Sequence, residues 1–108
     1  MRYCFVLTAQ GGDLVLAVAP LTEDAASISP PENVVSLQIV EDWFPRTYFY
    51  ARLTRSFSDA EVEENGTGLQ ATWRHGNADL GEITARLSAL ASPGRWGRVG
   101  RSYLDVIG

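Results

Sequence analysis

The sequence predicts an α+β fold: a single, mostly antiparallel sheet of about six strands, with one short acidic helix and one longer amphipathic helix. Two observations lead to this prediction. The first half of the chain holds four apolar or alternating segments, and the second half holds two segments with helix-start signals. With 108 residues, 45% of them hydrophobic, the chain is expected to form one domain over residues 1–108 with its own core.

The first predicted β-hairpin joins two apolar runs, residues 3–9 and 14–19. The Gln10-Gly11-Gly12-Asp13 sequence between them supplies the residues that a tight turn needs. Both runs are apolar on both of their faces. We therefore expect them in the centre of the sheet, covered on each side by helices or by a partner subunit. Residues 20–33 then form an irregular connection.

The second predicted hairpin spans residues 34–54. Residues 34–40 alternate apolar and polar side chains, which indicates a half-exposed strand. After a turn over residues 42–47, residues 48–54 are expected to form its partner strand.

Helix signals follow in the second half of the chain. Ser58-Asp59-Ala60-Glu61 has the pattern of a capping box, so a short acidic helix is expected there, ended by Asn65-Gly66. Residues 68–75 alternate again and predict a fifth strand.

The longest helix is expected after a cap at Asn77 or Asp79. Its apolar residues recur at helical spacing, and Ser92-Pro93-Gly94 ends it. A last strand is predicted over residues 103–107.

The composition excludes several chemistries. Thirteen acids and nine arginines give a net charge of −4, which argues against non-specific binding of nucleic acid. The chain has no lysine, so a phosphate-binding P-loop and a Schiff base are excluded. One cysteine and one histidine cannot make the usual zinc sites. We expect no cofactor, no metal and no membrane span, and a cytoplasmic location.

The first candidate contact surface is the segment EDWFPRTYFY, residues 41–50, in which five of ten residues are aromatic. Exposed tyrosine, tryptophan and arginine are typical of protein-interface hot spots. A small second core is the alternative interpretation. The candidate partner-binding residues are Trp43, Phe44, Tyr48, Tyr50 and Arg46.

The second candidate is the Gly-Arg repeat GRWGRVGR, residues 94–101. Arg95, Arg98 and Arg101 recur every three residues, and the glycines between them would let an anion approach the backbone. The same arginines can instead pair internally with acids of the chain, namely Asp59, Glu61, Glu63 and Glu64.

Three functional hypotheses follow. The first is a non-enzymatic protein-binding or regulatory module, such as an adaptor, an inhibitor or an immunity-type protein, with a second copy of the chain as the simplest partner. The second is a small enzyme or ligand-binding protein that holds an anionic small molecule at the Gly-Arg repeat. The third, which the net charge disfavours, is nucleic-acid binding through the same arginines.

Overall fold

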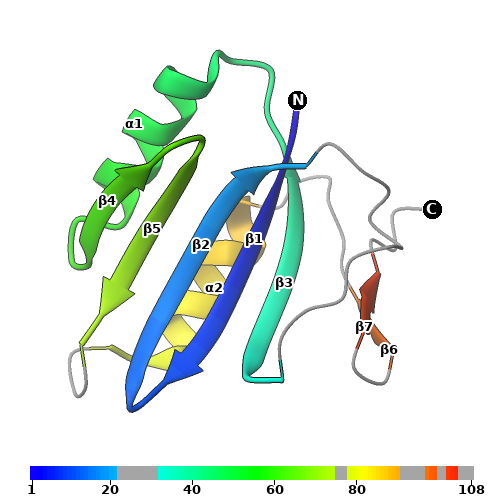
Figure 1. The fold of residues 1–108 in the computed structure, drawn as a ribbon, viewed down its shortest axis with the longest axis vertical. Coiled ribbons are helices and arrows are strands. Elements are labelled where there is room, and N and C mark those ends of the chain that lie inside the picture. The colour runs from blue at the N-terminus through cyan, green and yellow to red at the C-terminus, as the bar shows by residue number, and fades with distance from the viewer. Residues whose placement is uncertain (22–31, 75–77, 91–96, 100–101, 105–108) are drawn as a thin grey trace.

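A five-stranded antiparallel sheet with two helices organises the fold (Figure 1). The computed structural model describes residues 1–21, 32–74 and 78–90, and the backbone of residues 97–99 and 102–104. The elements are β1 (Arg2–Gln10), β2 (Asp13–Pro20), β3 (Val34–Glu41), α1 (Arg46–Ser56), β4 (Glu61–Asn65), β5 (Gly68–Trp73), α2 (Leu80–Leu90), β6 (Gly97–Val99) and β7 (Ser102–Leu104). The strand order of the main sheet is β3-β1-β2-β5-β4. The α+β class is confirmed, with five strands in this sheet instead of about six.

Two tight turns define the hairpins of the sheet. In the β1–β2 hairpin, Gly11 and Gly12 have φ values of 57° and 91°, which are the positive values that a type I′ turn needs at both central positions. This confirms the first predicted hairpin. In the β4–β5 hairpin, Gly66 has a φ of 59°, between the paired residues Asn65 and Gly68. The Asn65-Gly66 pair therefore turns a hairpin and does not end a helix.

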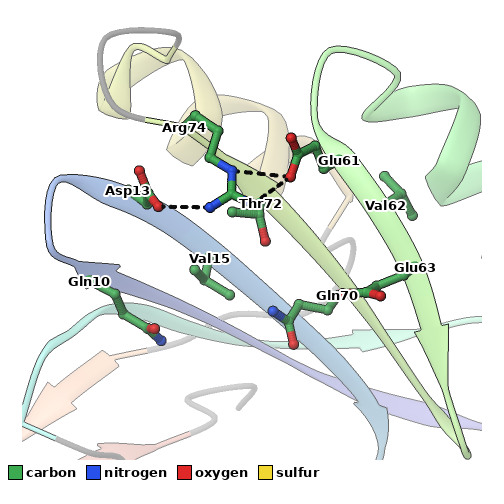
Figure 2. A pocket seen from close by; sticks show the side chains of 9 residues that line it. All are labelled: Gln10, Asp13, Val15, Glu61, Val62, Glu63, Gln70, Thr72 and Arg74. Carbon is green, nitrogen blue, oxygen red and sulfur yellow. Dashed lines mark hydrogen bonds and ion pairs between the residues drawn. The ribbon is translucent and has the colours of Figure 1, made fainter.

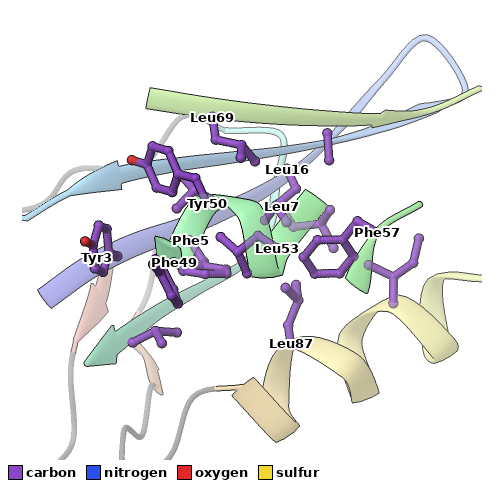
Figure 3. Close-up of a cluster of buried hydrophobic side chains, with 14 of the residues drawn as sticks. Tyr3, Phe5, Leu7, Leu16, Phe49, Tyr50, Leu53, Phe57, Leu69 and Leu87 are labelled. Carbon is purple, nitrogen blue, oxygen red and sulfur yellow. The ribbon is translucent and has the colours of Figure 1, made fainter. Parts of the chain in front are cut away.

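The core lies between one face of the sheet and the two helices (Figure 3). Strand β1 contributes every second residue to this face, and its neighbours contribute the residues paired with them. The buried members, each at most 2% exposed, are Tyr3, Phe5, Leu7, Leu16, Val18, Val40, Phe49, Tyr50, Leu53, Phe57, Leu69, Ala71, Trp73, Ile83 and Leu87.

The prediction of a strand over residues 48–54 is wrong, because these residues lie within helix α1. Its buried residues are Phe49, Tyr50 and Leu53, and Phe57 directly after the helix is buried too. Their spacing of one, three and four residues places them on one side of a helix, whereas a strand would bury every second residue. Packing against the sheet thus overrides the strand preference of the aromatic residues.

The short acidic helix predicted from residue 58 is also wrong. Residues 57–60 form a turn, in which the Ala60 N–H donates to the Phe57 carbonyl at 3.0 Å, and strand β4 follows. Three of the five residues of β4 are glutamates, and all three are exposed. At the edge of a sheet, charged side chains oppose unwanted pairing with another strand.

Strand β3 is more deeply buried than the predicted half-exposed strand. Leu37 and Ile39 are buried on one face, and Ser36 and Gln38 are buried on the face that carries the helices. The Gln38 side-chain amide donates to Ser88 Oγ of α2 at 3.3 Å. This hydrogen bond lets a polar residue face a helix within the core.

Helix α2 begins as predicted, with Asp79 as its cap. The Glu82 N–H donates to Asp79 Oδ1 at 3.1 Å, and Ile83 and Leu87 are buried on the inner side of the helix. The predicted last strand is shifted: β7 pairs with β6 in a separate two-stranded sheet. Neither helix of the described chain is long and apolar enough to cross a membrane.

Both helices lie on the same side of the sheet (Figure 1). The opposite side is open over β2, and we call it the open face. At its β3 end, Leu37 and Ile39 are buried and pack with half-buried Cys4 and Val6 in a second core cluster. Ala17 and Ala19 on that face are exposed. The prediction that both strands are covered on each side is therefore wrong for β2 at Ala17 and Ala19, whereas Cys4 and Val6 of β1 lie in a core cluster on this side too.

Two substitutions in α1 distinguish the observed helix from the strand that was predicted for residues 48–54. Leu53→Ala is expected to lower the free energy of unfolding by about 2–5 kcal/mol, because it opens a cavity in the core. Ala51→Glu is expected to change it by less than about 0.5 kcal/mol, since Ala51 faces outward on the helix. A strand would bury Ala51 beside Phe49 and Leu53, so a large loss on Ala51→Glu in urea titrations would contradict the helix.

Candidate partner-binding surface

Three aromatic side chains protrude from the protein where the chain enters α1. Trp43 is 87% exposed, Phe44 is 51% exposed and Tyr48 is 50% exposed. The rings of Phe44 and Tyr48 lie against each other, with centroids 4.8 Å apart. We call these three residues the aromatic patch. Such a cluster of exposed rings is a mark of an interaction site on a monomer surface.

Asp42 holds the aromatic patch in place. Its carboxylate accepts the Phe44 N–H at 2.8 Å and an Arg52 N–H at 3.2 Å, and the Asp42 side chain is only 11% exposed. The Arg52 guanidinium lies 5.9 Å from the centroid of the Phe44 ring, within range of a cation–π contact. Two main-chain hydrogen bonds between Asp42 and Met1 anchor this position to the start of β1. Contacts within the protein therefore position Phe44 and, through it, the Tyr48 ring.

Helix α1 supplies positive charge beside the aromatic patch. It contains Arg46, Arg52 and Arg55 and no acidic residue, in a chain whose net charge is −4. Arg46 and Arg55 are exposed, and the Arg52 side chain is 42% exposed. Phe44, Tyr48 and Arg52 follow one another at intervals of four residues, so they line one side of the helix and its approach.

The structure corrects one candidate residue of this surface. Tyr50 was expected beside Tyr48 on an exposed strand face, but it is 2% exposed. Successive residues of a helix point about 100° apart, so Tyr50 faces the core while Tyr48 faces outward. The Tyr50 hydroxyl donates to the Thr67 carbonyl at 2.7 Å, which ties α1 to the β4–β5 turn. Burial raises the pKa of Tyr50, so it stays a neutral donor.

The Gly-Arg repeat falls mostly outside the described residues. Arg95 and Arg101 are not described, and Arg98 is described only as a backbone position of β6, paired with Tyr103. The anion-binding role of these arginines therefore stays a prediction. Two of the acids that were expected as internal partners of these arginines bind other arginines. Asp59 binds Arg86 at 2.8 Å, and Glu61 binds Arg74 at 2.9 Å.

A polar hollow of about 400 Å³ at the β4 side of the open face is a second candidate site (Figure 2). Arg74 crosses it: its guanidinium donates to Glu61 at 2.9 and 3.1 Å and to Asp13 at 3.4 Å. The residues that line it are Gln10, Asp13, Val15, Glu61, Val62, Glu63, Gln70, Thr72 and Arg74.

Among the described residues, the lining of the polar hollow does not bring together a catalytic acid–base pair or a hydroxyl with its base. Arg74 binds two of its three carboxylates, so these do not stand as a free acid and base pair. The one hydroxyl, that of Thr72, has no histidine among the lining residues to act as its base. Within the part of the chain that the structure describes, no group of three or more potential ligands is placed to hold a metal ion.

The lone cysteine is a poor nucleophile. Cys4 lies half-buried in β1, and burial raises the pKa of its thiol to about 11. At neutral pH the thiol is therefore protonated, and a protonated thiol reacts slowly.

Asp59 is a structural carboxylate that binds one residue of α2 and one of β5. It accepts two hydrogen bonds from Arg86, at 2.8 and 3.0 Å, and one from the indole N–H of buried Trp73 at 3.0 Å. Arg86 and Trp73 hold the pKa of Asp59 well below its usual range. Asp59 therefore joins the turn before β4 to both α2 and β5.

Replacing Asp59 tests this junction. Asp59→Ala is expected to lower the free energy of unfolding by about 1–3 kcal/mol, mainly because the Trp73 N–H is left buried without an acceptor. Asp59→Asn keeps an acceptor oxygen and should lose less. Equal losses in the two variants, measured by urea titration, would contradict a role for the Trp73 hydrogen bond.

The same carboxylate gives a pH dependence with a definite sign. The folded state depresses the pKa of Asp59, so its contribution to stability is complete above the unfolded value of about 3.9. The contribution is lost as the pH falls through that value toward the folded one. Between pH 5 and pH 2, the wild type is expected to lose more stability than Asp59→Asn in thermal melts. Parallel pH profiles for the two proteins would contradict this assignment.

Comparisons with known proteins assign no function to these surfaces. No family model, no curated protein and no solved structure matches the chain. The candidate site therefore depends on the chemistry of its own residues, and the aromatic patch with the arginines of α1 is the surface that this chemistry favours.

Proposed function

We propose that this protein is a non-enzymatic protein-binding module that docks an acidic partner protein on the aromatic patch and the arginines of α1. The observation that carries the proposal is the 87% exposure of Trp43 beside two half-exposed rings. A partner that covers these rings removes apolar surface from water, which is favourable by about 25 cal/mol for each Å².

The contacts that hold Phe44 and Tyr48 support a binding role. Asp42 fixes the Phe44 main chain and Arg52, and Phe44 packs against Tyr48. A surface that is already ordered loses less conformational entropy when a partner binds, so more of the contact energy appears as affinity. Tryptophan, tyrosine and arginine are also the residue types most often found in interface hot spots.

The charge of α1 indicates the chemistry of the partner. Arg46 and Arg55 are exposed cations in an acidic protein, and α1 contains no acid that would oppose them. An acidic protein surface is therefore attracted to this face, and the attraction weakens as salt screens the charges. The net charge of −4 disfavours nucleic acid, whose binding depends on neutralising phosphates.

Selection from a random peptide library tests the proposal. The peptides are selected on the wild-type protein, and those enriched are expected to combine aspartate or glutamate with large apolar residues. The double variant Trp43→Ala with Tyr48→Ala removes two exposed rings and leaves the core intact. It is expected to raise the Kd of the selected peptides by about 30-fold, which corresponds to a hot-spot loss of about 2 kcal/mol.

Leu80→Ala is the matched control, because Leu80 is an exposed apolar residue on α2. It should leave the Kd unchanged. Peptides without acidic residues, or peptides that bind the double variant as tightly as the wild type, would refute the proposed surface. Tighter binding of a single-stranded oligonucleotide than of any selected peptide would favour nucleic acid instead.

A further inference from the structure

Strand β4 presents the opposite charge to that of α1. Its three glutamates are exposed, and β4 pairs with no described strand other than β5. Glu61 and Glu63 lie on the side of the sheet away from the helices, and Glu64 lies on the helix side. Arg74 binds Glu61. Glu63 and Glu64 have no ion pair with any residue that the structure describes.

The two charged elements are neighbours in the fold. Helix α1 leads into β4 through residues 57–60, and the hydrogen bond from Tyr50 to Thr67 joins α1 to the end of the β4–β5 hairpin (Figure 1). Among the described residues, no ion pair connects α1 with β4. Arg52 pairs with Asp42 and Glu61 pairs with Arg74, so Arg46 and Arg55 on α1 and Glu63 and Glu64 on β4 are the charges without an ion pair to a described residue.

We propose that the acidic partner is a second copy of this chain, with α1 of each protomer lying against β4 of the other. The inference rests on the proposed function, because it names the partner of the same surface. A twofold axis that passes between the two elements places α1 of each protomer against β4 of the other. A single rotation therefore brings both oppositely charged pairs into contact. The contact is isologous and closes at a dimer.

Charge also selects this arrangement over direct pairing of two β4 edges. Edge-to-edge pairing would bring three glutamates of each protomer together, and like charges in direct opposition destabilise a strand pair. The arginines of α1 instead neutralise the glutamates.

Sedimentation of charge-reversed variants tests the dimer. One variant carries Arg46→Glu and Arg55→Glu, two exposed positions with no ion pair among the described residues. The other carries Glu63→Arg and Glu64→Arg. Each variant alone is expected to have a dimer Kd at least tenfold above the wild-type value, because each opposes like charges at both contacts.

An equimolar mixture of the two variants is the decisive sample. In a heterodimer the acidic α1 of one protomer meets the basic β4 of the other, and the remaining contact keeps its original signs. The mixture is therefore expected to recover a 1:1 dimer with a Kd near that of the wild type. The circular dichroism spectrum of each variant shows that it has kept its fold.

Three results would overturn the dimer. The wild type could remain a monomer up to millimolar concentration, the separate variants could dimerise as well as the wild type, or the mixture could stay monomeric. In each case the peptide measurements decide the proposed function independently. Acidic peptides that bind a wild-type monomer through Trp43 and Tyr48 would keep the binding surface and reject only the second copy as its partner.

Discussion

Phe49 of α1 packs against Tyr3 and Phe5 of β1, with ring centroids 4.4 and 6.1 Å apart. This contact fixes the rotation of α1 about its own axis. Once Phe49 and Leu53 face the sheet, helical geometry turns Tyr48 and Arg52 toward solvent. The position of the aromatic patch and the direction of the α1 arginines are thus consequences of core packing, and the binding surface is the outer side of a core helix.

The opposite charges of α1 and β4 depend on the same packing. The two elements follow each other in the chain, and the core draws both to one end of the sheet. Most of their inward positions are apolar, and their charged side chains are exposed or partly exposed. In contrast, Asp59 and Arg86 neutralise each other within the protein, and Asp59 also accepts a hydrogen bond from the Trp73 indole. The molecule therefore combines charges that stabilise its own fold with charges that stay available to a partner.

The parts of the fold with strong local signals could be predicted from the sequence. The Gly11-Gly12 turn between two apolar runs identified the first hairpin, and the cap at Asp79 identified α2. Residues 48–54 were predicted as a strand because their aromatic content favours one. The helical spacing of the buried residues becomes clear only when Phe57 is included. Strand β4 was not predicted, because it has only one partly buried residue and therefore no alternation of apolar and polar residues in the sequence.

The candidate site was predicted in part. The exposure of Trp43, Phe44 and Tyr48 agrees with the predicted contact surface, whereas Tyr50 was misplaced together with its element. The contribution of Asp42 could not be read from the sequence, because its partner Arg52 comes within reach only when residues 46–56 form a helix. The acidic face of β4 was visible as three glutamates, but its position beside α1 required the fold.

The hydroxyl of Tyr3 is buried near the start of α1 without a hydrogen-bond partner among the described residues. Burial raises the pKa of this phenol, so it remains uncharged, and a buried hydroxyl without a hydrogen-bond partner costs stability. A phenylalanine ring would fill the same space without that cost. Replacing Tyr3 with phenylalanine would therefore raise the stability of the fold. This gain could offset the stability lost when residues of the neighbouring contact surface are changed.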